Sequence, residues 1–205
     1  MTLPTTRAVL IGVAAIVAVG VLGAGGWYWH ATTQQRAMAT YAEAMTRTQA
    51  ALGSEATADA RAAAIRELEA ALTQYPSGRG AAQVAYQLGN LRYQEQQYAP
   101  ARGAFELAVA QGATRTLRAL SQGGVAYTWE AERNYAKAVE AFKAALEGLG
   151  PKDFYYEELL LGLGRAQELG GHKADAIATY RRALGELTQS RRLEEIRARL
   201  AALEA

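Results

Sequence analysis

The sequence predicts an all-α protein: an N-terminal transmembrane helix, an α-solenoid of about four helical hairpins and a C-terminal capping helix. Three observations lead to this fold class. Residues 8–29 carry no charged side chain, a pattern of small and aromatic residues recurs every 37 or 38 residues, and the last segment has apolar residues at helical spacing. The abundant Ala, Leu, Glu and Arg favour helix along the rest of the chain.

The apolar run of residues 8–29 predicts the transmembrane helix. Its 22 residues span roughly 33 Å at about 1.5 Å per residue, slightly more than the ~30 Å hydrocarbon core of a bilayer. Trp27, Tyr28 and Trp29 close the run, and such rings prefer the headgroup level, so they predict a membrane-interface belt. One alternative is a secretory signal cleaved within residues 23–26, which are all Gly or Ala. Another is that the three aromatic rings pack on the following domain.

Topology rests on a small charge difference. Residues 1–7 carry Arg7 and the α-amino group, whereas Arg36 and Arg47 follow the run. A short basic flank before an apolar run is typical of a signal anchor, so we expect residues 1–7 in the cytoplasm. The remaining domain then lies on the other side of the membrane, outside the cytoplasm. The absence of cysteine fits an oxidising exterior and excludes an acylated lipoprotein anchor.

Residues 30–56 predict a connecting helix, from about Thr32 to Leu52, and a loop. The glycines within LGAGGW weaken helix by up to about 1 kcal/mol each relative to Ala, so this stretch is a candidate hinge.

A repeat follows over residues 57–188. The strings ARGAFELA, AVEAFKAA and AIATYRRA start at Ala101, Ala138 and Ala176, and AIRELEAA at Ala64 is a weaker copy. Each copy places a small, a large and a small residue at i, i+4 and i+7, which is one helix face. A small residue lies twelve positions before the first alanine of the last three copies, so we expect close helix pairs with the large residue filling the wedge to the next repeat. The large residues are Leu68, Phe105, Phe142 and Tyr180, and the earlier small residues are Gly89, Ala126 and Gly164.

The predicted helices of the repeat region are 57–75, then 81–95 with 98–111, 116–131 with 135–148, and 153–169 with 173–187. Residues 189–205 predict the capping helix that a solenoid needs, because Leu193, Ile196, Leu200 and Leu203 share one face.

This spacing resembles the tetratricopeptide repeat (TPR), whose consensus has a small residue, Ala, an aromatic and Ala at positions 8, 20, 24 and 27. Gly89, Ala101, Phe105 and Ala108 match that consensus, and the copy ending at Ala183 matches nearly as well. The copies exceed the 34-residue consensus by three or four residues, and we expect the surplus in turns such as ATRT and GPKD.

Taken whole, the chain is similar to the YfgM-type single-span TPR proteins, ancillary subunits of the Sec translocon. The similarity lies in the span ending in Trp-Tyr-Trp, the ATYAEA segment after it, and the closing ELLLGLGRAQELGGHKADAIATYRRAL. The resemblance implies that the span sits beside the translocon in a bacterial inner (cytoplasmic) membrane. It also implies that the TPR domain lies in the periplasm, where it meets emerging polypeptides and periplasmic chaperones. That family usually has a longer cytoplasmic segment before the span.

Residues for catalysis are scarce. The chain has no Cys, its two histidines lie far apart, and the acidic pairs Glu157/Glu158 and Glu194/Glu195 are sequence neighbours that point to different helix faces. Arg7 precedes the apolar run, which leaves 21 of the 22 basic side chains against 20 acidic ones and no basic stripe for nucleic acid. We therefore expect no enzyme, cofactor, metal or small-molecule substrate.

The TPR resemblance implies a concave groove lined by positions 2, 5, 9, 12 and 13 of each first helix. We expect a peptide platform there, because tyrosine rings cover apolar side chains while phenols and amides hydrogen-bond a backbone. The alternative is that Tyr86 and Tyr93 only pack between repeats. The carboxylate-clamping pattern of some TPRs is not met, since only Asn90 fits it. The candidate groove residues are Tyr86, Asn90, Tyr93, Gln94, Tyr127, Glu130 and Arg165, with Gln83, Glu158 and Glu168 at related positions.

The sequence thus predicts a membrane-anchored TPR adaptor outside the cytoplasm that assists protein translocation, assembly or chaperone handover. The alternative is a structural accessory subunit of one membrane complex, respiratory or cell-envelope, that uses the TPR domain as a docking face.

Overall fold

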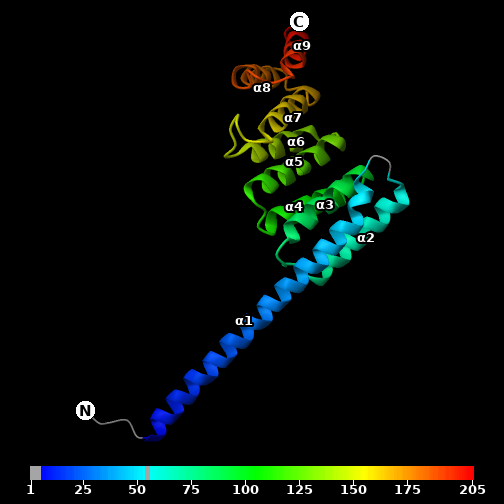
Figure 1. Ribbon diagram of the computed structural model, residues 1–205. Helices are drawn as coiled ribbons and strands as arrows, with labels where there is room; N and C mark the ends of the chain where they lie inside the picture. Colours follow the sequence, from blue (N-terminus) through cyan, green and yellow to red (C-terminus); the bar gives the residue numbers. More distant parts are fainter. Residues whose placement is uncertain (1–5, 54–55) are drawn as a thin grey trace, which may run out of the picture.

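The computed structural model describes residues 6–53 and 56–205, with side chains from Val17 onward except that of Leu52. The described part is helical, with no strand. It begins with α1 (Thr6–Thr48), a helix of 43 residues whose N-terminal part projects away from the other helices, and continues into the short 3-10 helix η1 (Gln49–Leu52) (Figure 1).

The other helices form a stacked body. Each predicted bound in the repeat region lies within three residues of the observed one, because every helix buries one periodic apolar face. Thr57, Thr114 and Asn134 cap the N-termini of three of these helices through their side chains. The helices are α2 (Ala58–Gln74), α3 (Ala81–Gln94), α4 (Tyr98–Ala110), α5 (Arg115–Ala131), α6 (Tyr135–Leu146), α7 (Tyr156–Leu169), α8 (Lys173–Glu186) and α9 (Leu193–Glu204).

Helix packing follows the chain order of a TPR-like solenoid. α3 packs on α4, α5 on α6 and α7 on α8, while the first helix of each pair also contacts the first helix of the next, α3 with α5 and α5 with α7. α9 packs on α8 at the C-terminal end of the stack, where Ile196 is buried (Figure 1).

The repeat aromatics act as wedges between neighbouring pairs, as the sequence predicts. Phe105 of α4 lies so close to α3 and α5 that a Cβ added at Gly89 or Gly124 would meet its ring at 2.6 or 2.7 Å. Phe142 fills the corresponding place against Gly162 of α7. One detail differs from the expectation: Gly89 faces the aromatic ring itself rather than the two alanines of the facing helix. Glycine is required there because the ring occupies the space of a side chain.

The segment predicted as a connecting helix belongs to the first helical pair. The C-terminal half of α1 packs on α2, and its Ala37, Tyr41 and Ala44 are buried in one core cluster with Leu68. The Tyr41 hydroxyl donates a hydrogen bond to the carbonyl of Tyr75 at the end of α2. The projecting segment and the first pair therefore share one continuous helix.

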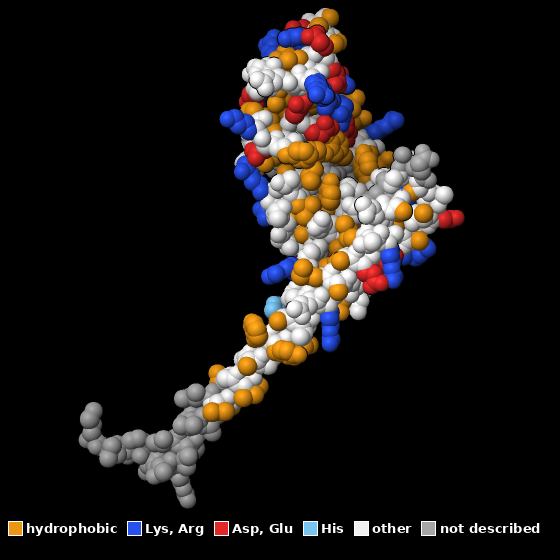
Figure 2. Space-filling model, viewed as in Figure 1, with side chains coloured by type: hydrophobic (Ala, Val, Ile, Leu, Met, Phe, Trp, Pro, Cys, Tyr) orange, Lys and Arg blue, Asp and Glu red, His pale blue; other side chains and the backbone are white. Residues whose placement is uncertain are grey.

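The stretch LGAGGW, a candidate hinge because of its glycines, is continuous helix within α1, so no break in the helix separates the apolar run from residues 32–48. Trp27, Tyr28 and Trp29 are 73%, 67% and 75% exposed, so the alternative that they pack on the following domain is wrong. The described side chains on the projecting part of α1 are apolar or uncharged (Figure 2).

Within the residues searched, no helix combines the length and apolar character that crossing a membrane requires. The first nine residues of the predicted span, 8–16, lie outside the described side chains.

Candidate functional site

A cleft between α3 and α5 brings together four of the predicted groove residues. Tyr86, Asn90 and Tyr93 come from α3 and Tyr127 comes from α5, and together they line a cavity of about 150 Å³. We call this the tyrosine cleft. Its remaining lining residues are Phe105, Leu120, Gly124 and Tyr155.

Helical spacing explains why these residues meet. Tyr86, Asn90 and Tyr93 are four and three positions apart, so they share one face of α3. Tyr86 also rests on the wedge residue Phe105, with ring centroids 5.9 Å apart, and Tyr93 meets Tyr98 edge to face at 5.5 Å. Both tyrosines are half-buried, so each packs on its own repeat and also lines the cleft.

The charged side chains predicted to line the groove form ion pairs within the chain. Arg165 of α7 donates two hydrogen bonds to the Glu130 carboxylate, at 2.5 and 2.8 Å. The Tyr127 hydroxyl donates to Glu158 at 2.9 Å, and Glu158 also accepts from Arg192 at 2.9 Å. These carboxylates and guanidinium groups hold adjacent repeats together, so they are already engaged within the chain.

Burial favours the protonated form of three phenols of the cleft, those of Tyr93, Tyr127 and Tyr155. Desolvation, reinforced by the nearby Glu158, raises the pKa of Tyr155 to about 12, and burial likewise raises the pKa values of Tyr93 and Tyr127. The hydrogen bonds that Arg165 donates to the Glu130 carboxylate raise the pKa of the Arg165 guanidinium, which stays charged in any case. The cleft therefore offers neutral phenol and amide groups over a wide pH range.

Three predicted positions lie elsewhere. Gln94 is exposed at the end of α3 and does not line the cleft, and Gln83 lines a different cavity. Glu168 accepts hydrogen bonds from the Tyr180 hydroxyl at 3.0 Å and from Arg199 at 3.3 Å. Its carboxylate links α7 to α8 and α9 rather than facing a ligand.

Sequence reasoning did not assign four lining residues to the groove: Phe105, which it named only as a wedge, Gly124, Leu120 and Tyr155. Leu120 occupies position 2 of its first helix, so the same positional rule that selected Tyr127 could have found it. Tyr155 lies just before α7, outside any helical register, so no repeat position indicates it.

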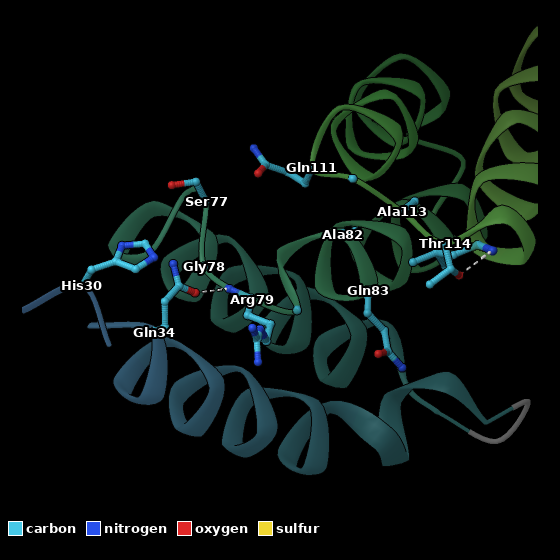
Figure 3. A pocket seen from close by; sticks show the side chains of 13 residues that line it. His30, Gln34, Ser77, Gly78, Arg79, Ala82, Gln83, Gln111, Ala113 and Thr114 are labelled. Atoms are coloured by element: carbon cyan, nitrogen blue, oxygen red, sulfur yellow. Dashed lines mark hydrogen bonds between the residues drawn. The ribbon is translucent and has the colours of Figure 1, made fainter. Parts of the chain in front are cut away.

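A second cavity, of about 480 Å³, lies where α1 joins the solenoid (Figure 3). We call it the junction pocket. Three segments far apart in the sequence line it: α1 near its exposed aromatic residues, the turn between α2 and α3, and the turn between α4 and α5. The residues are His30, Gln34, Ser77, Gly78, Arg79, Gly80, Ala82, Gln83, Gln111, Gly112, Ala113, Thr114 and Leu117.

Comparison with known proteins adds a distant likeness only. No protein-family model matches the chain, and no curated protein matches it. Among solved structures, it is similar to a TPR repeats protein from Bacteroides fragilis, with 15% sequence identity and a TM-score of 0.46 over 74% of this chain and 63% of that one. The chain thus spans 63% of the length of that structure. The TPR-like assignment rests on the helix pairing and the aromatic wedges described above.

Proposed function

We propose that the chain is a non-enzymatic TPR adaptor that binds an extended polypeptide in the tyrosine cleft. The observation that carries this proposal is the convergence of Tyr86, Asn90, Tyr93 and Tyr127 on one cavity between two first helices. Rigid tyrosine rings cover apolar side chains at low entropic cost, and such anchors dominate protein-binding surfaces. The Asn90 amide and the neutral phenols supply hydrogen bonds for a peptide backbone.

Charge narrows the kind of peptide that suits the cleft. Arg165 is paired with Glu130, and Glu158 is paired with Arg192, so neither arginine is available to clamp a terminal carboxylate. An internal segment with apolar side chains fits these neutral walls better than a charged chain end.

We further propose that α1 anchors the chain in a membrane. Four aliphatic side chains on the projecting part of α1 are more than half exposed, as are the three aromatic residues after them, and bilayer insertion would cover them all. In this arrangement residues 8–29 span the inner membrane of a bacterium, the N-terminus lies in the cytoplasm, and the solenoid meets translocating polypeptides or chaperones in the periplasm. The Sec translocon is the proposed membrane partner. The four aliphatic residues are Val17, Val19, Val21 and Leu22.

Site-specific photocrosslinking in membranes tests the cleft. A photoreactive residue replaces Asn90, which lines the cleft, and in a matched chain it replaces Gln94, one turn further along α3 and outside the cleft. We expect polypeptide adducts from position 90 and few from position 94. Equal adducts at both positions, or none at position 90, would refute peptide binding in this cleft. Adducts to translocon subunits or chaperones would name the partner.

A second candidate function is that of a structural subunit docked on one membrane complex. It is favoured by a hollow of about 270 Å³ between α4, α5 and α6, lined mainly by apolar groups such as Val109, Val125, Ala141 and Ala144. In that case the chain co-purifies stoichiometrically with one complex. Changes in residues 8–29 or Val125→Gln release it, whereas Tyr93→Ala does not.

A further inference from the structure

The junction pocket is lined by several residues with hydrogen-bond donors and, among the described residues, by no acidic side chain. None of the described residues that line it is Asp or Glu, although the chain contains 20 acidic residues. The residues that line it include Gln34, Gln83, Gln111 and Ser77, which carry amide or hydroxyl groups, and Arg79, which carries a guanidinium group. A pocket of this composition suits an anion that accepts several hydrogen bonds.

A hydrogen bond from the backbone of Arg79 fixes the position of its turn against α1. The Arg79 N–H donates to the Gln34 side-chain carbonyl at 2.6 Å, as Figure 3 shows, which ties the α2–α3 turn to α1. The same turn sits tightly on α1, because a Cβ added at Gly78 would meet the Cβ of Ala37 at 2.6 Å. Among the described residues, Arg79 forms no ion pair. Its guanidinium is therefore not engaged by any described carboxylate, and Arg79 is one of the residues that line the pocket.

The position of the pocket along α1 suggests where that ligand comes from. With Trp29 at the membrane interface, His30 and Gln34 lie about 1.5 and 7.5 Å further along the helix axis. The headgroup layer on each side of a bilayer is roughly 5 to 7 Å thick. The α1 side of the pocket therefore lies at the level of the lipid phosphates.

We propose that the junction pocket binds the phosphate of an anionic phospholipid headgroup, with Arg79 supplying the charge and the amide side chains supplying hydrogen bonds. This inference rests on the proposed anchoring of α1 in a membrane. Bound in this way, a lipid headgroup bridges α1 and two turns of the solenoid, and it holds the solenoid against the membrane surface.

The experiment uses the full chain in nanodiscs that contain equal amounts of phosphatidylglycerol and phosphatidylcholine. Native mass spectrometry measures the ratio of the two lipids retained on the released protein. We expect a clear excess of phosphatidylglycerol on the parent chain, and Arg79→Gln reduces that excess about ten-fold, as loss of a charge-assisted hydrogen bond does. The double variant Gln83→Leu/Gln111→Leu leaves the charge unchanged and also reduces the excess, by about five-fold or more.

Two matched variants separate a built site from general attraction. Arg36→Gln removes a charge from the same part of α1 outside the pocket, and Gln94→Leu removes an amide far from it. We expect at most a few-fold change for the first, in line with one charge near an anionic surface, and none for the second. Equal losses in Arg36→Gln and Arg79→Gln, with no loss in the double glutamine variant, would overturn the proposal in favour of diffuse attraction.

Two further arms identify the source of the phosphate and isolate the anchoring step. Displacement of the lipid by millimolar inorganic phosphate would assign the pocket to a free anion and overturn the lipid proposal. Flotation with neutral phosphatidylcholine vesicles tests anchoring alone: a chain that does not float overturns both the anchor and this inference. A chain that floats without any phosphatidylglycerol excess overturns only the inference. Circular dichroism confirms that each variant is folded.

Discussion

Alanine substitution at Gly124 and at Gly103 should change stability in opposite directions. Both glycines lie inside helices, α5 and α4, where alanine favours helix over glycine by about 1 kcal/mol. A Cβ at Gly103 meets no atom within 4 Å, so Gly103→Ala should gain that full amount. A Cβ at Gly124 would meet the ring of Phe105 at 2.7 to 2.8 Å, well inside the 3.4 Å at which ordinary contact begins.

The ring of Phe105 has no room to retreat. It would have to move by about 0.7 Å, and α3 closes its other side, where a Cβ at Gly89 would already meet the ring at 2.6 Å. Overpacking of this kind costs about 1 to 3 kcal/mol, so Gly124→Ala should lose up to about 2 kcal/mol net. The two variants should then differ by about 1 to 3 kcal/mol, which corresponds to several degrees in melting temperature for a chain of this size.

Thermal and urea unfolding of the full chain in one detergent, followed by circular dichroism, measures this difference. Gly103→Ala serves as the matched control because it makes the same chemical change in a neighbouring helix. If Gly124→Ala raised the melting temperature as much as Gly103→Ala does, Phe105 would not be the tightly fitted wedge described above.

Three other predictions concern single contacts. Glu130→Gln should lower the free energy of unfolding by about 1 to 3 kcal/mol, since the half-buried guanidinium of Arg165 loses its carboxylate; urea unfolding measures this. The phenol of Tyr155 has a pKa of about 12 in the fold against 10.0 for a free phenol, so the unfolded chain loses this proton first as the pH rises. Stability should therefore fall between pH 10 and 12, and Tyr155→Phe should remove part of that fall, as unfolding at several alkaline pH values would show. Gly78→Ala should loosen the contact of its turn with Ala37 and increase amide hydrogen exchange there, whereas unchanged exchange would contradict the tight contact.

Helix periodicity made the solenoid predictable. Each helix of the body buries one face of regularly spaced residues, so the helix bounds and the wedge roles of Phe105 and Phe142 follow from spacing alone. The residues of the tyrosine cleft were predictable from the TPR resemblance, because Tyr86, Asn90 and Tyr93 occupy the positions that line the groove in that repeat. A local pattern suffices wherever contacts repeat with the chain.

Features that depend on irregular segments were not predictable in this way. Tyr155 reaches the cleft from the residue before a helix, and the junction pocket joins α1 to two turns that are distant in sequence. The first helical pair was also missed, because its first helix continues into an apolar run of a different character. Ala37, Tyr41 and Ala44 carry the helical spacing of a packed face, but no repeat motif marks them.

Continuity of α1 has a mechanical consequence for the proposed adaptor. A Cβ added at Gly20, Gly23, Gly25 or Gly26 would meet nothing within 4 Å, so no packing requires glycine there, and the helix passes through these positions unbroken. In a bilayer a break would leave backbone N–H and C=O groups without partners, at a cost of several kcal/mol per group, which outweighs the roughly 1 kcal/mol by which each glycine weakens helix. From Trp29 to the buried Tyr41 the helix rises about 18 Å, and it then packs directly into the first pair. If α1 anchors the chain as proposed, this unbroken helix sets the distance between the tyrosine cleft and the membrane. The gain in local concentration would then apply to partners that present a binding segment at that distance.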